Sequence, residues 1–422
     1  MGLKDKNVLL GVTGSISAYK ACDLVQRLKD EGAHVRVIMT ASAAKLVHPN
    51  TFAALTGYRV PVDGWSGVES GAMDHIDLAR WADVYLVAPC TAHTIAEFAH
   101  GLTGSLLSLL YLVYERHAYI APAMNSVMLD APAVRRNLAT LQAKGDILLP
   151  TGEGVLACGE IGYGKLLDVA QIIAYLNTHR ALAAPYPALA GKKVLISLGH
   201  TREKWDDVRF ISNRSSGKTG LALARAFTLS GADVHVVAGH ADEPITPGFA
   251  VTRVETSAGF QKEMLGRQGA ADVVIMAAAI ADFVPSQTFR GKRKASKSVE
   301  KIELQPFPNI LLELGKRKSK GQILVGFALE TADALAQAEA KMKERHCDVM
   351  VVNNPVADDT GFGRDVVLAG VLSRRPQAAS ASLQDWDKDQ LANTVAAEVQ
   401  ALLTESAETA QAPDPAKKSR AG

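Results

Sequence analysis

The sequence predicts an α/β protein made of two Rossmann-like domains with mainly parallel sheets. Short apolar runs rich in β-formers alternate with helical segments, which is typical of a parallel sheet covered by helices on both faces. This alternation stops at one stretch rich in alanine and proline and then starts again. The chain of 422 residues is long enough for two such domains.

The first domain is expected over residues 1–178. It begins with an apolar run that we interpret as a buried strand, NVLLGVTG at 7–14. The helical spacing of residues 15–32 predicts a helix that ends at Gly32, because glycine is the preferred residue just past a helix. Three further strands are expected at AHVRVIMT (33–40), ADVYLVAPC (82–90) and HAYIAPAMN (117–125).

A linker is expected at residues 179–191, a second domain at 192–403 and a disordered tail at 404–422. The second domain repeats the pattern with a strand at 192–199, a helix at 220–231 and a strand at 232–239. Apolar runs predict more strands at 271–279, 322–330 and 347–355. The charged segment 289–301 is expected to be a mobile loop.

Composition excludes several classes of partner. The net charge of +2 gives no general attraction to nucleic acid or to an anionic membrane. The four cysteines form no C-x-x-C pair and no cluster with zinc spacing, so no protein-held metal site is expected. Scattered cysteines, the lack of a signal-peptide pattern and the lack of an apolar run of about 18 residues predict a cytoplasmic protein.

Two turns are candidate phosphate sites. Gly14, Ser15 and Ser17 lie where the first strand meets a helix, and they suit either a monophosphate or a simple helix cap. Residues 217–219 read Gly-Lys-Thr, but a P-loop also needs glycine at the position of Ser212 and a buried strand before it. We therefore predict that this is not a P-loop. The Ser-Ser-Gly turn suits an anion or a capped surface helix.

Three residues of the first domain are candidates: His75 lies a few residues before a predicted strand, Asn125 follows another, and Cys158 is surrounded by glycines. Taken singly, His75 is compatible with a surface histidine, Asn125 with a turn former and Cys158 with a small buried hydrophobe. Taken together, the segments AMDHIDLARWADVYLVAP, APAMNSVM and EGVLACGEIGYGKLLD resemble the phosphopantothenoylcysteine decarboxylase family of flavoproteins.

The second half resembles a phosphopantothenate–cysteine ligase. The resemblance rests on TREKWDDVRFISNRSSGKTG, AAAIADFVP, GFALET and NNPVADDTGFGRD. Over roughly residues 5–400, the chain is thus similar to a bifunctional family of coenzyme A biosynthesis.

For the first domain the resemblance implies a flavin-binding fold, FMN as cofactor and a homo-oligomer built from trimers. His75 would be the base that activates the substrate, Asn125 would hold the substrate carboxylate, and Cys158 would protonate the reduced intermediate. Histidine suits a base because it exchanges protons near neutral pH, and a thiol is mostly protonated there. The residues expected around FMN are Gly14, Ser15, Ser17, Thr40, Ser42 and Thr91.

For the second domain the resemblance implies phosphopantothenate, cysteine and CTP as substrates, with Mg²⁺ held by the phosphates. Asn213 would contact the acyl intermediate, and Lys292 would close on the reacting phosphates. The expected nucleotide contacts are Ala277, Ala278, Asp282, Pro308, Asn309, Ile310, Phe327, Lys341 and Arg345.

Departures from the family pattern leave two alternatives open. The turn SLGHT replaces a Thr-Ala-Gly end of strand, and Arg345 replaces a lysine, which keeps charge but not shape. One alternative is an FMN-dependent decarboxylase of a cysteine carboxylate with a non-catalytic ligase-like domain. The other is a non-enzymatic, flavin-binding regulatory or interaction subunit, against which the retention of His75, Asn125 and Cys158 argues.

Overall fold

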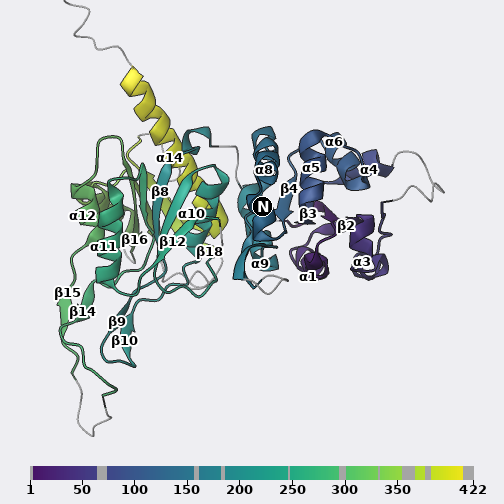
Figure 1. The fold of residues 1–422 in the computed structure, drawn as a ribbon. Coiled ribbons are helices and arrows are strands. Elements are labelled where there is room, and N and C mark those ends of the chain that lie inside the picture. Colours follow the sequence, from purple (N-terminus) through teal and green to yellow (C-terminus); the bar gives the residue numbers. More distant parts are fainter. Residues whose placement is uncertain are drawn as a thin grey trace, which may run out of the picture. The chain divides into compact units, whose positions relative to one another are not determined.

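The computed structural model describes residues 3–63, 74–155, 161–181, 186–245, 248–293, 301–330, 333–353, 366–375 and 382–411. Contacts divide the chain into two compact units, residues 1–180 and 181–422. Each unit is an α/β structure built around its own sheet (Figure 1).

The first unit contains a parallel five-stranded sheet in the order β2-β1-β3-β4-β5. Its strands are β1 (Asn7–Val12), β2 (His34–Met39), β3 (Val84–Cys90), β4 (Tyr119–Pro122) and β5 (Ile147–Leu148). The four strands expected from apolar runs are confirmed, whereas the two-residue β5 was not predicted. The strand order reverses between β1 and β3, which makes that point the topological switch of the sheet.

Helices connect these strands. Leu24, Val25 and Leu28 of α1 (Lys20–Asp30) recur at helical spacing and are buried, and the helix stops just before Gly32. Buried residues of α5, α6 and α8 cover one face of the sheet, and Figure 1 places α1 and α9 toward the other face. The remaining elements are η1 (Ile16–Tyr19), α2 (Ala41–Ala44), α3 (Pro49–Thr56), α4 (Asp74–Trp81), α5 (Ala92–His100), α6 (Leu106–Val113), α7 (Ser126–Asp130), α8 (Pro132–Lys144), β6 (Gly152–Val155), β7 (Ile161–Lys165) and α9 (Val169–Ala181).

The second unit contains an eight-stranded sheet in the order β12-β11-β8-β13-β16-β17-β18-β19. Its strands are β8 (Lys193–Leu198), β11 (Asp233–Ala238), β12 (Ala250–Arg253), β13 (Val273–Met276), β16 (Ile323–Leu329), β17 (Val349–Asn353), β18 (Val366–Ser373) and β19 (Gln384–Asp387). The first six are parallel in the doubly wound order 3-2-1-4-5-6, and β18 and β19 add an antiparallel edge. The switch point lies between β8 and β13.

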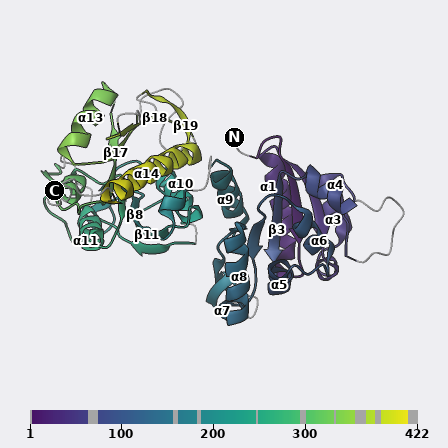
Figure 2. The same ribbon diagram turned by 90° about the horizontal axis from the view of Figure 1, so that it is seen from above.

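Helices lie on both faces of this sheet (Figure 2). One face packs against α10 (Lys218–Leu229) and α14 (Lys388–Gln411), and the other against α11 (Ser257–Gln268), α12 (Ile310–Lys316) and α13 (Ala334–Glu344). Two small antiparallel ribbons stand apart from the sheet: β9 (Arg202–Lys204) with β10 (Phe210–Ser212), and β14 (Phe283–Pro285) with β15 (Leu304–Pro306).

Two expected irregular stretches are partly ordered. The helix α9 continues to Ala181, inside the stretch expected to be a linker. Residues 186–191 of that stretch include a 3₁₀ turn, η2 (Pro187–Leu189), which packs on α14 because Tyr186 and Leu189 are apolar and buried in the core of the second unit. The tail expected to be disordered from residue 404 remains helical to Gln411, because Leu402 and Leu403 anchor α14 in the same core. The segment 294–300 of the expected mobile loop lies outside the described residues.

Among the helices that the structure describes, none is both long and apolar enough to cross a membrane.

Candidate active sites

The candidate cofactor residues of the first unit lie at the carboxyl ends of neighbouring strands. Each strand is followed by a short helical segment whose N-cap is one of the predicted residues. Ser15 caps η1, Thr40 caps α2, Thr91 caps α5 and Asn125 caps α7. Side-chain caps leave other N–H groups of each first turn free for a ligand, and helix N-termini favour negative charge. Four such termini therefore open on one edge of the sheet.

The turns after β1, β2 and β3 are in direct contact. A Cβ atom added to Gly14 would lie 2.5 Å from Cβ of Ser42. The first two turns therefore approach so closely that only glycine fits at position 14. The hydroxyl of Thr13 donates to the carbonyl of Pro89 at 2.7 Å and accepts from the backbone N–H of Thr91 at 3.0 Å, which joins the first turn to the third. The three turns form one polar cradle.

This cradle fits a phosphorylated flavin. It lies at the switch point between β1 and β3, and the strand order 2-1-3-4-5 is the one that binds FMN at this point in flavodoxin-like proteins. Hydroxyl groups and free N–H groups suit a phosphate and the polar edge of a flavin. Ser17, the second residue of η1, donates its backbone N–H to Ser15 Oγ at 3.3 Å and completes the predicted set.

Gly14→Ala is expected to abolish flavin binding, because the new methyl group must push the turn after β1 away from Ser42. The measurement is the visible absorbance of flavin in the purified variant. Gly57→Ala is a matched control, because a Cβ at Gly57 meets no neighbouring atom, although its left-handed φ of 79° adds some strain. Full flavin occupancy in Gly14→Ala would contradict the assignment of this cradle.

Of the three candidate catalytic residues of the first unit, the structure describes two, His75 and Asn125. His75 is half-buried and is the second residue of α4. Asn125 accepts a hydrogen bond from the backbone N–H of Val127 at 2.8 Å. Cys158 lies outside the described residues.

The hairpin formed by β6 and β7 is tied to the turn that carries Asn125. The residue before Asn125, Met124, donates its N–H to the carbonyl of Gly164 at 2.8 Å, and the residue after it, Ser126, bonds the carbonyl of Tyr163. The connection between β6 and β7 contains Cys158 in the sequence. These bonds hold β7 beside Asn125.

The second unit contains a cavity of about 650 Å³ at the switch point between β8 and β13. Its lining includes Asn213, Ala277, Ala278, Asp282, Pro308, Asn309, Ile310, Phe327, Lys341 and Arg345, all predicted from the sequence. The exposed Lys292 is not among the described residues that line it. The sequence prediction therefore located this cavity, but the structure leaves Lys292 outside it.

The start of α10 forms one wall of the cavity. Gly220 lets this helix lie against β8, because a Cβ there would come within 2.4 Å of Cβ of Leu198. Ser215, Ser216 and Lys218 line the cavity around Gly217, the N-cap of α10. The strand before this turn, β10, belongs to a half-exposed ribbon outside the main sheet, as expected for a turn that is not a P-loop.

The turn that departs from the family pattern holds this wall in place. His200 is buried, and its Nδ1–H donates to the carbonyl of Ser215 at 2.7 Å. Two more bonds join the turn to the residues after β13, from the N–H of Ala279 to Gly199 O at 2.8 Å and from the N–H of Ala281 to Thr201 Oγ1 at 3.2 Å. The altered sequence therefore retains an ordered cavity wall.

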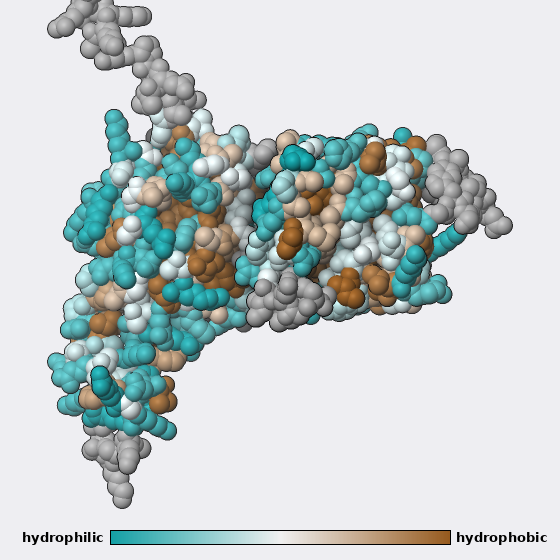
Figure 3. Space-filling view, in the orientation of Figure 1, coloured by the Kyte–Doolittle hydropathy of each residue, from teal (hydrophilic) through white to brown (hydrophobic). Residues whose placement is uncertain are grey.

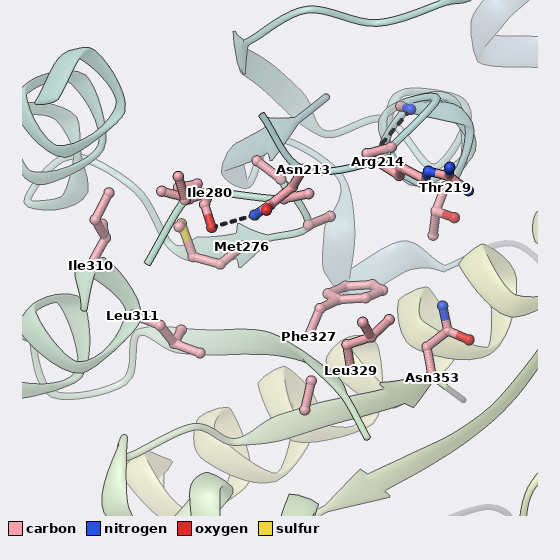
Figure 4. A pocket seen from close by; sticks show the side chains of 18 of the residues that line it. Asn213, Arg214, Thr219, Met276, Ile280, Ile310, Leu311, Phe327, Leu329 and Asn353 are labelled. Atoms are coloured by element: carbon pink, nitrogen blue, oxygen red, sulfur yellow. Dashed lines mark hydrogen bonds between the residues drawn. The ribbon is translucent and has the colours of Figure 1, made fainter. Parts of the chain in front are cut away.

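Asn213 lines the cavity, and its side-chain amide points toward Ile280 (Figure 4). Its Nδ2 donates to the carbonyl of Ile280 at 2.9 Å, which fixes the plane of the side-chain amide. The second Nδ2 hydrogen and the Oδ1 atom remain available to a ligand. On the α13 side of the cavity, Lys341 forms an ion pair with the buried Glu330.

Several lining residues were not predicted, among them Leu329, Asn353 and Lys388. Asn353 ends β17, where the apolar run of the strand changes to Asn-Asn-Pro. A polar residue at the carboxyl end of a parallel strand is the signal that could have identified it.

The fold and the two sites define a two-part α/β protein of the nucleotide-binding class, with one site at the switch point of each sheet. Residues 2–180 match the family model described as Flavoprotein. Residues 189–403 match the model described as DNA/pantothenate metabolism flavoprotein C-terminal domain.

Similar proteins carry both parts. The coenzyme A biosynthesis bifunctional protein CoaBC of Bacillus subtilis (strain 168) is 40% identical over 371 residues, 88% of this chain and 91% of the relative. CoaBC of Vibrio cholerae (strain ATCC 39315) is 35% identical over 401 residues, 93% and 97% of the two chains. A cysteine/cysteine sulfinic acid decarboxylase of an unknown prokaryotic organism is 37% identical over 325 residues, 76% and 90% of the two chains. The chain belongs to the family of coenzyme A biosynthesis bifunctional proteins CoaBC.

Proposed function

We propose that this chain is a bifunctional enzyme of coenzyme A biosynthesis. The second unit joins phosphopantothenate to cysteine with CTP, and the first unit decarboxylates phosphopantothenoylcysteine to phosphopantetheine with FMN. The observation that carries this proposal is the cavity at the second switch point, which gathers Asn213 with the predicted nucleotide residues in one lining.

Ligation needs an activated carboxylate, because a free carboxylate is a poor electrophile. In the proposal, CTP supplies the nucleotidyl group, and Mg²⁺ is held mainly by phosphate oxygens. In the described part of the chain, no group of three or more His, Cys, Asp or Glu residues is placed to hold a metal ion. The turn at Ser215, Ser216 and Gly217 is suited to the phosphate of the acid substrate, since it lies at the N-terminus of α10.

Lys341 and Arg345 supply positive charge for the nucleotide on the opposite side of the cavity. Asn213 lines the same cavity. Its second N–H is suited to the developing oxyanion at the acyl carbon, because the bond to Ile280 already fixes the amide plane.

Decarboxylation leaves an electron pair on the α-carbon of the cysteine moiety. When bound, FMN would supply reversible two-electron chemistry, because oxidation of the thiol-bearing carbon beside this α-carbon makes the cysteine side chain able to accept the electron pair. Gly14, Ser15, Ser17, Thr40, Ser42 and Thr91 are proposed to hold it. Asn125 would orient the carboxylate, His75 would take up a proton as base, and Cys158 would return one as acid.

Lys292 is proposed to act on the reacting phosphates, and its segment is anchored on both sides. The backbone N–H of Gly291 donates to Asp207 Oδ2 at 2.6 Å, and that of Arg293 donates to Asp206 Oδ2 at 3.2 Å. The two aspartates belong to the segment between β9 and β10, where this sequence reads Trp-Asp-Asp. They fix the backbone on either side of Lys292.

Asp206→Ala is expected to lower the kcat of ligation, because the segment that carries Lys292 loses an anchor.

Burial raises the pKa of Asp206, but backbone hydrogen bonds from Val208, Arg209 and Arg293 outweigh this and leave the pKa below its ordinary value. The charged form therefore stabilises the fold above about pH 4, and this contribution is lost as the pH falls through the lowered pKa. Asp385→Ala, in an exposed edge strand, is the control, and equal ligation rates in the two variants would contradict the anchor.

The oligomer is proposed to be built from trimers of the first unit. The space-filling view shows hydrophobic surface on this unit (Figure 3). Large apolar side chains are exposed next to the flavin turns, including Ile16 and Tyr19 of η1 and Val127 and Met128 of α7. Exposed apolar residues gathered near one site are typical of a surface that another copy covers. Gel filtration of the flavin-loaded protein tests this, and a stable monomer that holds FMN would contradict it.

The test of the whole proposal is one reaction. Purified protein is incubated with phosphopantothenate, cysteine, Mg²⁺ and either CTP or ATP, and the products are identified by mass spectrometry. Phosphopantetheine with CTP is the expected result. Failure to form a conjugate with either nucleotide would support a non-catalytic second unit, an alternative that the full-length similarity to CoaBC proteins does not favour.

A further inference from the structure

A buried acceptor in the cavity of the second unit has no hydrogen-bond partner among the residues that the structure describes. The Oδ1 atom of Asn353 is inaccessible to solvent and meets no donor among the described residues. Asn353 nevertheless lines the cavity, at the carboxyl end of β17. An unpaired buried acceptor destabilises a protein, so its presence in a binding cavity indicates that a ligand supplies the missing donor.

The sheet register places Asn353 on the α10 side of the cavity. Asn353 is paired with Leu329 on β16, and Phe327 precedes Leu329 by two residues, so the three side chains share one face. Phe327 packs against the core beneath α10 and α14. Figure 4 shows the three side chains pointing into the same space.

The cationic side chains that are proposed to bind the nucleotide come from the opposite face of the sheet. Lys341 and Arg345 come from α13 and its C-terminal end, and α13 packs on the opposite face of the sheet. The side of Asn353 is the side of Ser215, Ser216 and Gly217, where the phosphate of the acid substrate is proposed to bind. The acid would therefore span the distance from the start of α10 to Asn213, along Phe327 and Asn353.

We infer that Asn353 is a specificity residue that recognises the amide group of the acid substrate. Phosphopantothenate contains one secondary amide between its phosphate and its carboxylate. The N–H of that amide is the donor that the Oδ1 atom of Asn353 lacks, and a side-chain carboxamide also has N–H groups for the amide carbonyl. This inference rests on the proposed ligation and assigns a residue for which the sequence analysis gave no role.

The test uses a substrate analogue in which an ester oxygen replaces the amide N–H. Wild-type protein is expected to use the amide about tenfold better than the ester, as judged by kcat/KM in CTP-dependent ligation, the effect of about one hydrogen bond. Asn353→Ala is expected to use the two substrates about equally, with an unchanged KM for CTP. Asn353→Asp retains an acceptor and is expected to keep the preference for the amide.

Leu329→Ala is the matched control, because Leu329 is the neighbour of Asn353 in the sheet and has no polar group. It is expected to keep the wild-type ratio of kcat/KM for the amide substrate to kcat/KM for the ester analogue. An unchanged ratio in Asn353→Ala, a loss of the ratio in Asn353→Asp, or a raised KM for CTP in Asn353→Ala would overturn the inference. If wild-type protein forms no conjugate at all, the proposed ligation itself fails, which is a different result.

Discussion

Replacing Asn213 by alanine is expected to reduce the kcat of ligation by about 10²–10³-fold, the usual cost of removing one preorganised oxyanion donor. The amide of Asn213 is already oriented by its bond to the carbonyl of Ile280, so it needs no rearrangement when charge develops at the acyl carbon. The variant is assayed by conjugate formation from phosphopantothenate, cysteine and CTP. FMN content and decarboxylation of added phosphopantothenoylcysteine are expected to be unchanged, because those sites lie in the other unit.

Ser212→Ala is the matched control for this variant. Ser212 precedes Asn213, and its hydroxyl donates to the carbonyl of Thr201 at 2.7 Å, a contact that supports the chain without reaching the acyl group. A modest loss in Ser212→Ala beside a large loss in Asn213→Ala separates a catalytic role from support of the loop. Similar losses in both variants would show that Asn213 acts only through the local structure.

Most of the fold could be predicted because the central strands are continuous apolar runs in the sequence. Runs such as those at 82–90 and 271–279 are buried on both faces of a parallel sheet, so they stand out in the sequence. The strand order could not be predicted, because periodicity does not reveal which strands are neighbours. The ribbon of β9 and β10 was also missed, since each strand is only three residues long and the segment around them is largely polar.

The candidate sites were predictable where they depend on strand ends. Residues just after β1, β3 and β13 lie at the carboxyl edges of the sheets. Gly14 was predicted from its position there, whereas Thr91 and Ala278 were predicted from resemblance. Lys292 was predicted from resemblance alone, and it lies in a segment beyond the cavity lining. Asn353 was missed because its significance depends on an unpaired oxygen atom, which no sequence pattern reveals.

Replacing His75 by alanine is expected to reduce decarboxylation by about 10²–10⁴-fold, the contribution typical of a general base. Carbon dioxide release from phosphopantothenoylcysteine is the measurement, and flavin content and ligation are expected to be retained. His100→Ala is the matched control, because His100 is an exposed histidine at the end of α5. Decarboxylation at the wild-type rate in His75→Ala would remove this residue from the mechanism.

The two variants also test whether the sites work independently. His75→Ala is expected to accumulate phosphopantothenoylcysteine, and Asn213→Ala is expected to form little of this conjugate. An equimolar mixture should then make phosphopantetheine from phosphopantothenate, cysteine and CTP, because the conjugate released by one variant is a substrate for the other. If both variants are active in their own half-reaction and the mixture makes none, the conjugate must pass between sites without release, and ligation and decarboxylation are coupled within one assembly.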